Sequence, residues 1–369
     1  MFAYLVVLLG AVPLFLRVGI PRFPRLKSST IVLVAAASLV VLAVLFFVLY
    51  PHANSHVAGV GSDRDDAADM GAHALLRGQW PYHGRTYLGG TISQLPGLLL
   101  LAVPFVALGH SAYAAFFWLP VLFALLWNLR DEGRVALLLA WLALIASPVV
   151  VREVVTGGDL LTNTISVMVA MCLIAVALER RYRWRLVLAG LFMGFVLSSR
   201  LNFLFVLLPL AAFAWKRYGV RHVLEFLVPT AVSMAAVTLP FWVGRASFPP
   251  LTSSDHLSAF DGSLPGGQSL VIAIALVLTI ALAVAAPPRL GSVFAQAAAV
   301  QAFFIVAVGA HEAVQAGSLN LTDLTPGYGL PVVLLALGAL ACNGSYFRAL
   351  EESVPRRVAG VNTASSVAD

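Results

Sequence analysis

The chain has 369 residues, of which 60% are hydrophobic and 11% are charged, and its mean hydropathy is +0.92. This composition excludes an ordinary soluble globular protein and predicts a polytopic membrane protein. The net charge of +6 does not indicate nucleic-acid binding, because the basic residues lie in short loops between apolar runs, where they report membrane topology. Cys172 and Cys342 both fall within apolar runs, so neither a disulfide framework nor a cysteine metal site is expected.

The apolar runs predict an all-α fold, because a chain that crosses lipid must satisfy its backbone groups internally. Runs near the length needed to cross a bilayer, roughly 20 residues, lie near 1–19, 30–50, 113–129, 135–151, 160–178, 223–243, 268–286, 293–311 and 326–341. The run 186–215 is too long for one span and is interrupted by Ser198-Ser199-Arg200-Leu201-Asn202, so we expect a hairpin of two short spans there. These segments give a predicted count of 11 transmembrane helices.

Arginine and lysine in the short loops predict the orientation of the chain. The basic clusters lie at 17–27, 180–185, 216–221 and 348–357 and are expected to be cytoplasmic. The acidic stretch after 30–50 then emerges on the non-cytoplasmic face. This orientation requires segment 93–109 not to cross. Because Pro96, Gly97 and Pro104 disfavour one straight helix there, we expect it to lie in the outer membrane interface. The alternative is 12 spans, with 93–109 crossing and another segment not.

The predicted organisation has four parts. Residues 1–29 form an extra N-terminal span and inner loop, and residues 30–243 form the membrane core, whose first outer loop covers 51–112. A second outer loop and the C-terminal spans occupy 244–341, and a cytoplasmic tail follows at 342–369.

The most chemically distinctive stretch is the start of the first outer loop, which carries Asp63, Asp65, Asp66 and Asp69 within seven residues. Clustered carboxylates can act as a general base on a hydroxyl group, or Asp63 and Asp65 can hold Mg²⁺ or Mn²⁺ against a phosphate. The structural alternative is a capping box, with Ser62 three residues before Asp65. A helix cap needs one or two acidic residues rather than four, which favours a functional role.

Two later polar residues stand where apolar segments begin or turn. Asp159 precedes the 160–178 span, where it could serve only as a helix cap. Arg200 lies at the outer tip of the 186–215 hairpin, where an arginine is costly unless it reaches water, a lipid headgroup or a ligand phosphate.

The order of these motifs resembles the C-type (GT-C) glycosyltransferase superfamily. The acidic stretch is followed by a predicted short helix that ends Ala-x-x-Leu-Leu-x-Gly-x-x-Pro-Tyr over 72–82, which is similar to the first outer loop of these enzymes. Arg152-x-x-x-x-Gly-Gly-Asp159 resembles their second outer loop. The stretch Ala189-Gly190-Leu-Phe-Met-Gly194, followed by Ser-Ser-Arg200-Leu-Asn202, resembles an inner turn and a basic outer tip. The resemblance covers roughly residues 30–215.

This resemblance implies a hexosyl- or pentosyltransferase of cell-envelope glycan biosynthesis. Such an enzyme moves a sugar from a polyprenyl-phosphate carrier to a lipid, glycan or protein acceptor on the non-cytoplasmic face. It implies catalytic roles for Asp63, Asp65 and Asp66, with Asp63 the first choice of base, and it implies substrate or phosphate binding by Arg64, Asp159, Arg200, Asn202 and Tyr82.

The chain departs from the family pattern in its extra N-terminal span, in the spacing between aspartate and glycine, and in having no soluble C-terminal domain. Two alternatives therefore stay open: a transporter or flippase of a lipid-linked sugar, and a non-catalytic assembly subunit with a GT-C-like fold.

Overall fold

A computed structural model describes residues 14–16, 22–24, 26–57, 62–130, 132–243, 248–252, 260–262, 265–317 and 326–343. Apart from one isolated bridge between Arg85 and Thr91, the regular structure within these ranges is helical, which confirms the all-α class for them. The α-helices are α3 (Ser28–Ala53), α4 (Arg64–Leu76), α5 (Pro96–Val106), α6 (Ala114–Arg130), α7 (Gly133–Ala146), α8 (Pro148–Val155), α9 (Leu160–Arg180), α10 (Arg183–Leu197), α11 (Leu207–Tyr218), α12 (Val220–Trp242), α13 (Pro249–Thr252), α15 (Gly267–Ala285), α16 (Leu290–Ala316) and α17 (Leu330–Cys342). Short 3₁₀ segments connect them: η2 (Pro81–His83), η3 (Ser111–Tyr113), η4 (Leu201–Val206) and η5 (Pro326–Gly329).

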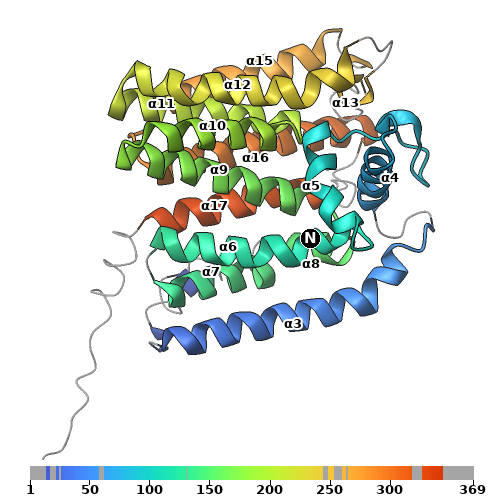
Figure 1. Cartoon of the computed structure of the whole chain (residues 1–369), viewed down its shortest axis with the longest axis horizontal. Helices are drawn as coiled ribbons and strands as arrows, with labels where there is room; N and C mark the ends of the chain where they lie inside the picture. The colour runs from blue at the N-terminus through green and yellow to red at the C-terminus, as the bar shows by residue number, and fades with distance from the viewer. Residues whose placement is uncertain are drawn as a thin grey trace, which may run out of the picture.

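The long helices lie side by side as a bundle with two distinct ends (Figure 1). Helices α4 and α5 lie at one end, and the turns that join α9 to α10 and α11 to α12 lie at the other. The 21 residues of α9 connect these ends, because a helix of that length extends about 30 Å, which is the thickness of the hydrocarbon core. The α4 end therefore carries the acidic stretch, and the opposite end carries the basic clusters at 180–185 and 216–221.

The predicted count of 11 spans is wrong, and so is the alternative of 12. Within the described ranges, six helices are long and apolar enough to cross a membrane, or seven if the bent pair formed by α7 and α8 counts as one span. The six are Ser28–Ala53, Ser111–Arg130, Leu160–Arg180, Val220–Trp242, Gly267–Ala285 and Leu290–Gln315. These helices are those of a multi-pass integral membrane protein, so the prediction of a polytopic membrane protein holds.

The missing spans have separate physical causes. The 186–215 run folds into α10, of 15 residues, and α11, of 12 residues, with η4 between them, and each helix is shorter than a bilayer requires. Helix α17 has only 13 residues. The predicted 135–151 span is bent by 79° near Pro148, and most of the predicted span 1–19 lies outside the described residues.

The length of α5 agrees with the prediction that 93–109 does not cross. Its 11 residues extend about 16 Å, roughly half the hydrocarbon thickness. The start of α5 is bound to the turn after α10, where the amides of Leu95 and Gly97 donate to the carbonyls of Ser199 and Ser198 at 3.1 and 2.8 Å. A Cβ atom on Gly97 would lie only 2.5 Å from the carbonyl oxygen of Phe195, so this approach requires glycine.

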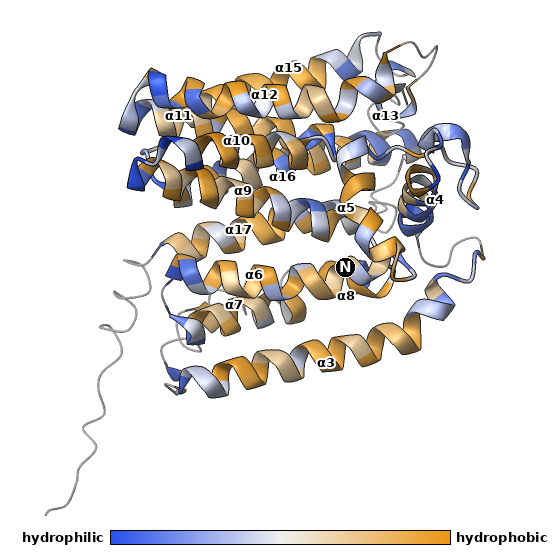
Figure 2. Cartoon of the chain, viewed as in Figure 1, coloured by the Kyte–Doolittle hydropathy of each residue, from blue (hydrophilic) through white to orange (hydrophobic). Residues whose placement is uncertain are grey.

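The centre of the bundle is α9, whose side chains Ile165, Met168 and Met171 are fully buried. By contrast, α3 exposes Val32, Leu33, Phe47 and other large apolar side chains along most of its length. Figure 2 shows apolar residues over the middle of the bundle and polar residues toward its two ends. Exposed apolar helices with polar ends are the pattern that a surrounding bilayer stabilises.

Helices α10 and α12 pack closely because α10 presents two glycines to its neighbour. A Cβ atom on Gly190 would lie 2.6 Å from the carbonyl oxygen of Phe226, and Thr230 donates a 3.0 Å hydrogen bond to the carbonyl of Gly190. Gly194 approaches Thr230 in the same way. Small residues that allow close backbone approach are a common basis of helix packing in membranes. The predicted inner turn at 189–194 is therefore wrong, since these residues lie inside α10.

Candidate functional site

The acidic stretch forms the first turn of α4, but its side chains do not cap the helix. Asp63 occupies the N-cap position without a side-chain capping bond. The Ser62 hydroxyl accepts a 3.3 Å hydrogen bond from the amide of Arg64 rather than from that of Asp65. The capping box that offered a purely structural explanation is therefore absent, and the carboxylates contact other segments of the chain.

All four carboxylates in this stretch bind partners in other segments, and three of them are half-buried. Asp63 accepts a 2.7 Å hydrogen bond from Thr86, Asp66 lies 3.1 Å from His56, and Asp69 lies 2.7 Å from His110 and accepts from the amide of Ser111 at 2.7 Å. These contacts connect α4 to the loop before it, the loop after η2 and the start of η3. The negative charges thus point in separate directions, which reduces their mutual repulsion.

Asp65 is the buried member of the stretch, with 1% of its surface exposed. Its Oδ2 accepts a 2.8 Å hydrogen bond from the hydroxyl of Tyr50 in α3. The pKa of Asp65 is raised to about 7, chiefly by burial; the Tyr50 hydrogen bond lowers it, and the charges of Asp66 and Asp69 raise it. A carboxyl group with this pKa changes its charge near neutral pH.

Gly157 allows the loop before α9 to reach this carboxyl group. Its φ of +68° lies in the left-handed region, and a Cβ atom there would lie 3.0 Å from the Tyr50 ring and 3.3 Å from Asp65. Gly157 is thus explained by a close approach to α3 and α4, whereas a Cβ atom on Gly158 would clash with the carboxyl group of Glu153.

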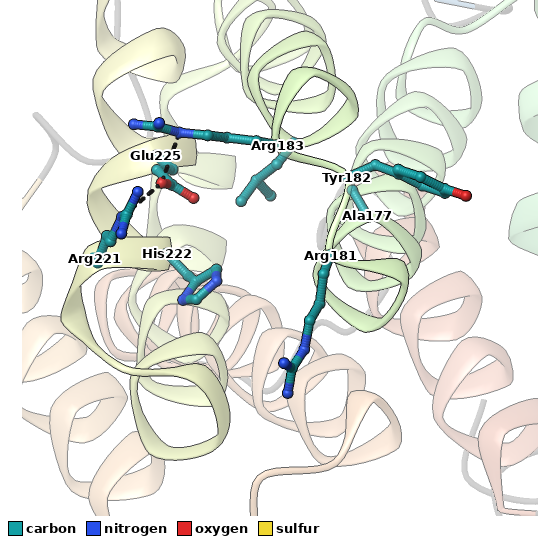
Figure 3. A pocket seen from close by; sticks show the side chains of 8 residues that line it. Ala177, Arg181, Tyr182, Arg183, Arg221, His222 and Glu225 are labelled. Atoms are coloured by element: carbon teal, nitrogen blue, oxygen red, sulfur yellow. Dashed lines mark hydrogen bonds and ion pairs between the residues drawn. The ribbon is translucent and has the colours of Figure 1, made fainter.

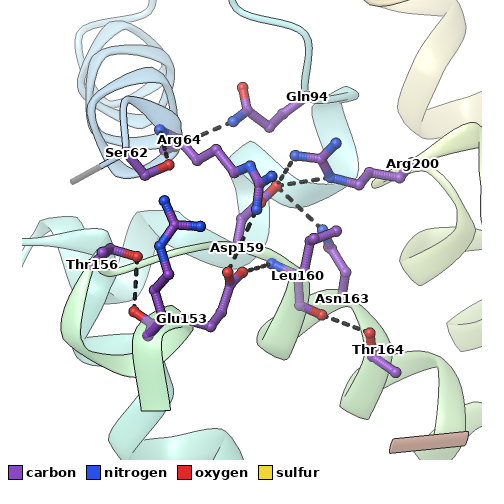
Figure 4. A network of polar contacts seen from close by, with 11 residues as sticks. Ser62, Arg64, Gln94, Glu153, Thr156, Asp159, Leu160, Asn163, Thr164 and Arg200 are labelled. Carbon is purple, nitrogen blue, oxygen red and sulfur yellow. Dashed lines mark hydrogen bonds and ion pairs between the residues drawn. The ribbon is translucent and has the colours of Figure 1, made fainter. Parts of the chain in front are cut away.

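Two arginines from separate segments converge on two buried carboxylates beside α4 (Figure 4). Nε and one terminal nitrogen of Arg200, in the turn between α10 and η4, donate to the same oxygen of Asp159 at 2.9 and 2.6 Å. Arg64, in the first turn of α4, contacts Glu153 of α8 at 3.5 Å. The Arg64 guanidinium also lies 4.6 Å from the centre of the Tyr328 ring.

The start of α9 connects the two ion pairs. Oε1 of Glu153 accepts a 2.8 Å hydrogen bond from the amide of Leu160, so the acid of α8 caps the next helix. Asn163, one turn into α9, donates to Asp159 at 3.4 Å. Gln94, just before α5, donates to the carbonyl of Arg64 at 3.2 Å. We refer to Arg64, Glu153, Asp159, Asn163 and Arg200 as the arginine–carboxylate network.

Several buried acceptors at this site have no hydrogen-bond donor among the described residues. They are Asp65 Oδ1, Gln94 Oε1, Asp159 Oδ1 and Asn163 Oδ1. A buried acceptor without a donor typically costs about 1–3 kcal/mol. Such a concentration is expected where a hydroxyl-bearing ligand or water supplies donors.

The described residues do not form a metal site here. In these parts of the chain, no three histidine, cysteine, aspartate or glutamate side chains are grouped closely enough to hold a metal ion. Asp63 and Asp65, the predicted Mg²⁺ or Mn²⁺ ligands, face Thr86 and Tyr50 instead. The donor set of these described residues does not fit a divalent cation.

Two predicted site residues have other partners. Tyr82 is buried in an apolar cluster with Ala67, Ile92, Leu95, Leu99 and Phe248, and its hydroxyl donates to the carbonyl of Gln94 at 3.1 Å. Asn202 exchanges hydrogen bonds with Gln301 of α16, at 2.8 and 2.9 Å. Both residues hold helices in place around the site rather than joining the arginine–carboxylate network.

Glu153 and Tyr50 are site residues that were not predicted from the sequence. Glu153 lies one residue after Arg152 inside the quoted motif, and an acid adjoining an apolar run was a usable signal. Tyr50 ends a long apolar helix, where an interfacial anchor is the ordinary explanation. Its contact with Asp65 depends on the packing of α3 against α4 and η3, which no local pattern reveals.

Comparisons with family models, with curated proteins and with solved structures give no match for this chain. Its function is therefore argued from the geometry of the site.

Proposed function

We propose that the protein is a glycosyltransferase that moves a sugar from a polyprenyl-phosphate carrier to an acceptor hydroxyl group. The observation that carries this proposal is the convergence of Arg64 and Arg200 beside the acidic first turn of α4, at one end of a bundle of apolar helices. This arrangement combines cationic donors for a phosphate with carboxylates for a hydroxyl at the level where a lipid headgroup lies.

The two arginines are suited to a phosphate that becomes more negative as it leaves. Arg200 uses Nε and one terminal nitrogen for Asp159, and its other terminal nitrogen is not used in that pair. The 3.5 Å contact of Arg64 with Glu153 is long for a charge-assisted hydrogen bond, so its guanidinium can shift toward a second acceptor. Stabilisation of a leaving group by fixed charges is commonly a large part of catalysis.

Asp63 is our choice for the general base. Its carboxylate is half-buried at the N-terminus of α4 and is oriented by the 2.7 Å hydrogen bond from Thr86. Asp65 is almost fully buried and already bound by Tyr50, which fits a positioning role.

In the proposed reaction, Asp63 removes the proton of the acceptor hydroxyl, and the hydroxyl oxygen forms a bond to the anomeric carbon. The bond from that carbon to the phosphate oxygen breaks, and its electron pair leaves with the polyprenyl phosphate. Arg64 and Arg200 neutralise this charge. Donors on the sugar hydroxyls would satisfy the unpartnered oxygens of Asp159 and Asn163.

The proposal places the site on the non-cytoplasmic face. It is supported by the position of the basic clusters at 180–185 and 216–221 at the opposite end of the bundle, since arginine and lysine concentrate on the cytoplasmic side.

The test is sugar transfer from a polyprenyl-phosphosugar donor in proteoliposomes. Asp63→Asn is expected to lower the rate about 10²–10⁴-fold, as loss of a general base does. Asp66→Asn is the matched control, because Asp66 binds the exposed His56 and should retain most of the activity. Normal rates in all three of Asp63→Asn, Asp65→Asn and Asp66→Asn would show that the catalytic proposal is wrong.

The same assay separates the rival functions. Consumption of the donor with release of free carrier supports a transferase, whereas movement of the donor across the membrane without consumption identifies a flippase. Neither consumption nor donor binding in correctly folded protein would identify a non-catalytic subunit.

A further inference from the structure

A second polar site lies at the other end of the bundle from α4. It is a pocket of about 230 Å³ between the turn that joins α9 to α10 and the first two turns of α12. Three arginines and one histidine line it: Arg181, Arg183, Arg221 and His222 (Figure 3). Glu225 is the one acidic side chain among the lining residues, so the pocket is cationic.

Glu225 orients two of the arginines without using all their donors. Nε of Arg183 lies 2.9 Å from Oε1 of Glu225, and Nε of Arg221 lies 3.1 Å from the same oxygen. The terminal nitrogens of both guanidinium groups stay available for another acceptor. A single carboxylate therefore fixes two cations on one side of the pocket, as Figure 3 shows.

Arg181 and His222 complete the lining. Arg181 adopts a left-handed backbone conformation, with φ of +54°, which is uncommon for a residue with a side chain. No ion pair or hydrogen bond is recorded for its side chain among the described residues. Nδ1 of His222 donates to the carbonyl of Tyr218 at 2.8 Å, which leaves Nε2 for a ligand.

Exposed aromatic side chains mark this end of the bundle as a membrane interface. Tyr182, Trp184 and Trp215 are about half to two-thirds exposed, at 47%, 60% and 64%. Tyrosine and tryptophan favour the headgroup level of a bilayer. The cationic pocket thus lies at the depth of lipid phosphate groups.

We propose that this pocket binds the phosphate group of an anionic ligand, and that a phospholipid headgroup is the source that its position favours. Basic pockets between transmembrane helices bind anionic headgroups by charge and by hydrogen bonding. This inference does not depend on the function proposed for the α4 end, which lies about one membrane thickness away.

The test measures binding to the full-length protein in a neutral detergent. Three probes are compared: short-chain phosphatidylglycerol, short-chain phosphatidylcholine and inorganic phosphate. Phosphatidylglycerol is expected to bind saturably and more tightly than phosphatidylcholine. Arg181→Gln and Arg221→Gln should each weaken its binding roughly fivefold, as expected for about 1 kcal/mol per arginine.

The matched control is Arg180→Gln, which removes the same charge from the neighbouring exposed residue outside the pocket. It is expected to leave binding within about twofold of wild type, and the melting temperatures of all three variants should agree. Tighter binding of phosphatidylglycerol than of inorganic phosphate identifies a lipid ligand, and equal binding with competition identifies a soluble phosphate compound. The proposal is overturned if neither phosphatidylglycerol nor inorganic phosphate binds. It is also overturned if Arg180→Gln weakens binding as much as Arg181→Gln.

Discussion

The two ends of the bundle use arginine in opposite ways. At the α4 end, Arg200 and Asp159 are buried together, with 14% and 3% of their side-chain surfaces exposed. At the other end, Arg183 and Glu225 form a pair of similar length, but 69% of the Arg183 side chain is exposed, against 11% of Glu225.

Because of this difference in burial, losing one partner has a different cost in the two pairs. A buried ion pair cannot lose one partner without leaving the other charge in a poorly solvated site. A mostly exposed arginine exchanges its partner for water at little cost, and Glu225 keeps a second arginine, Arg221, when Arg183 is lost. The α4 end is therefore a region where substitutions alter folding and function together, and the opposite end is one where binding can be altered while folding is retained.

The largest expected effect is that of Arg200→Met. It leaves Asp159 charged and buried without its partner, and we expect a loss of about 3–5 kcal/mol in the free energy of unfolding. Thermal unfolding in detergent measures this loss. The double variant Asp159→Asn/Arg200→Met is the control, because removing both charges should recover part of the stability. An unchanged melting temperature in Arg200→Met would contradict the buried pair.

The next effect is a pH dependence of stability that arises from Asp65. Its pKa is raised to about 7 in the folded protein, against about 4 in an unfolded chain, so the folded state binds more protons between these values. The contribution of Asp65 to stability is complete below pH 4 and is lost as the pH rises through 7, a change on the order of 4 kcal/mol for a shift of about three pKa units.

Melting temperatures measured between pH 4 and 8 test this contribution, with Asp65→Asn as the comparison. Because the asparagine side chain does not titrate, the melting temperature of the variant should fall less than that of wild type as the pH approaches 7. Identical pH profiles for the two proteins would show that Asp65 is not the titrating group.

A smaller effect is expected for Tyr50→Phe, which removes the hydroxyl that donates to Asp65. The hydrogen bond is worth about 1 kcal/mol. Because it also stabilises the charged carboxylate, its loss should raise the pKa of Asp65 and shift the pH profile upward. Tyr113→Phe, which removes a neighbouring hydroxyl that does not contact Asp65, is the control and should leave the profile in place.

The smallest effect is expected at the basic end. Arg183→Ala removes a mostly exposed arginine while Glu225 keeps its contact with Arg221, so it should change the free energy of unfolding by less than about 1 kcal/mol. Chemical unfolding in detergent is the measurement. A loss comparable with that of Arg200→Met would remove the distinction between the two ends.

The general architecture could be predicted from the sequence because hydropathy and charge are read over long windows. Apolar runs predicted α3, α9, α12, α15 and α16, and Pro96, Gly97 and Pro104 indicated that 93–109 does not cross. The number of spans could not be obtained in this way. A run of apolar residues sets an upper limit on helix length, and the 3₁₀ segment between α10 and α11 shortens two helices that hydropathy counts as complete spans.

Part of the site could also be predicted from the sequence. Asp159 and Arg200 were predicted separately, as an acidic and a basic residue at the ends of apolar segments. The structure joins them in one ion pair. Asn202 was grouped with Arg200 because it is two residues away, yet it binds α16. Adjacency in the chain does not determine which face of a turn a side chain occupies, and that face decides its partner.

By itself, the sequence determined that this chain is a helical membrane protein with an acidic and a basic end, because composition and charge placement are properties of the chain. Only the tertiary structure decided which charges are buried together and which carboxyl group changes its charge near neutral pH. It also decided which oxygens lack donors. Burial and hydrogen bonding depend on contacts between separate segments, such as Tyr50 with Asp65, 15 residues apart, and Arg64 with Glu153, 89 residues apart, and no local pattern encodes those contacts.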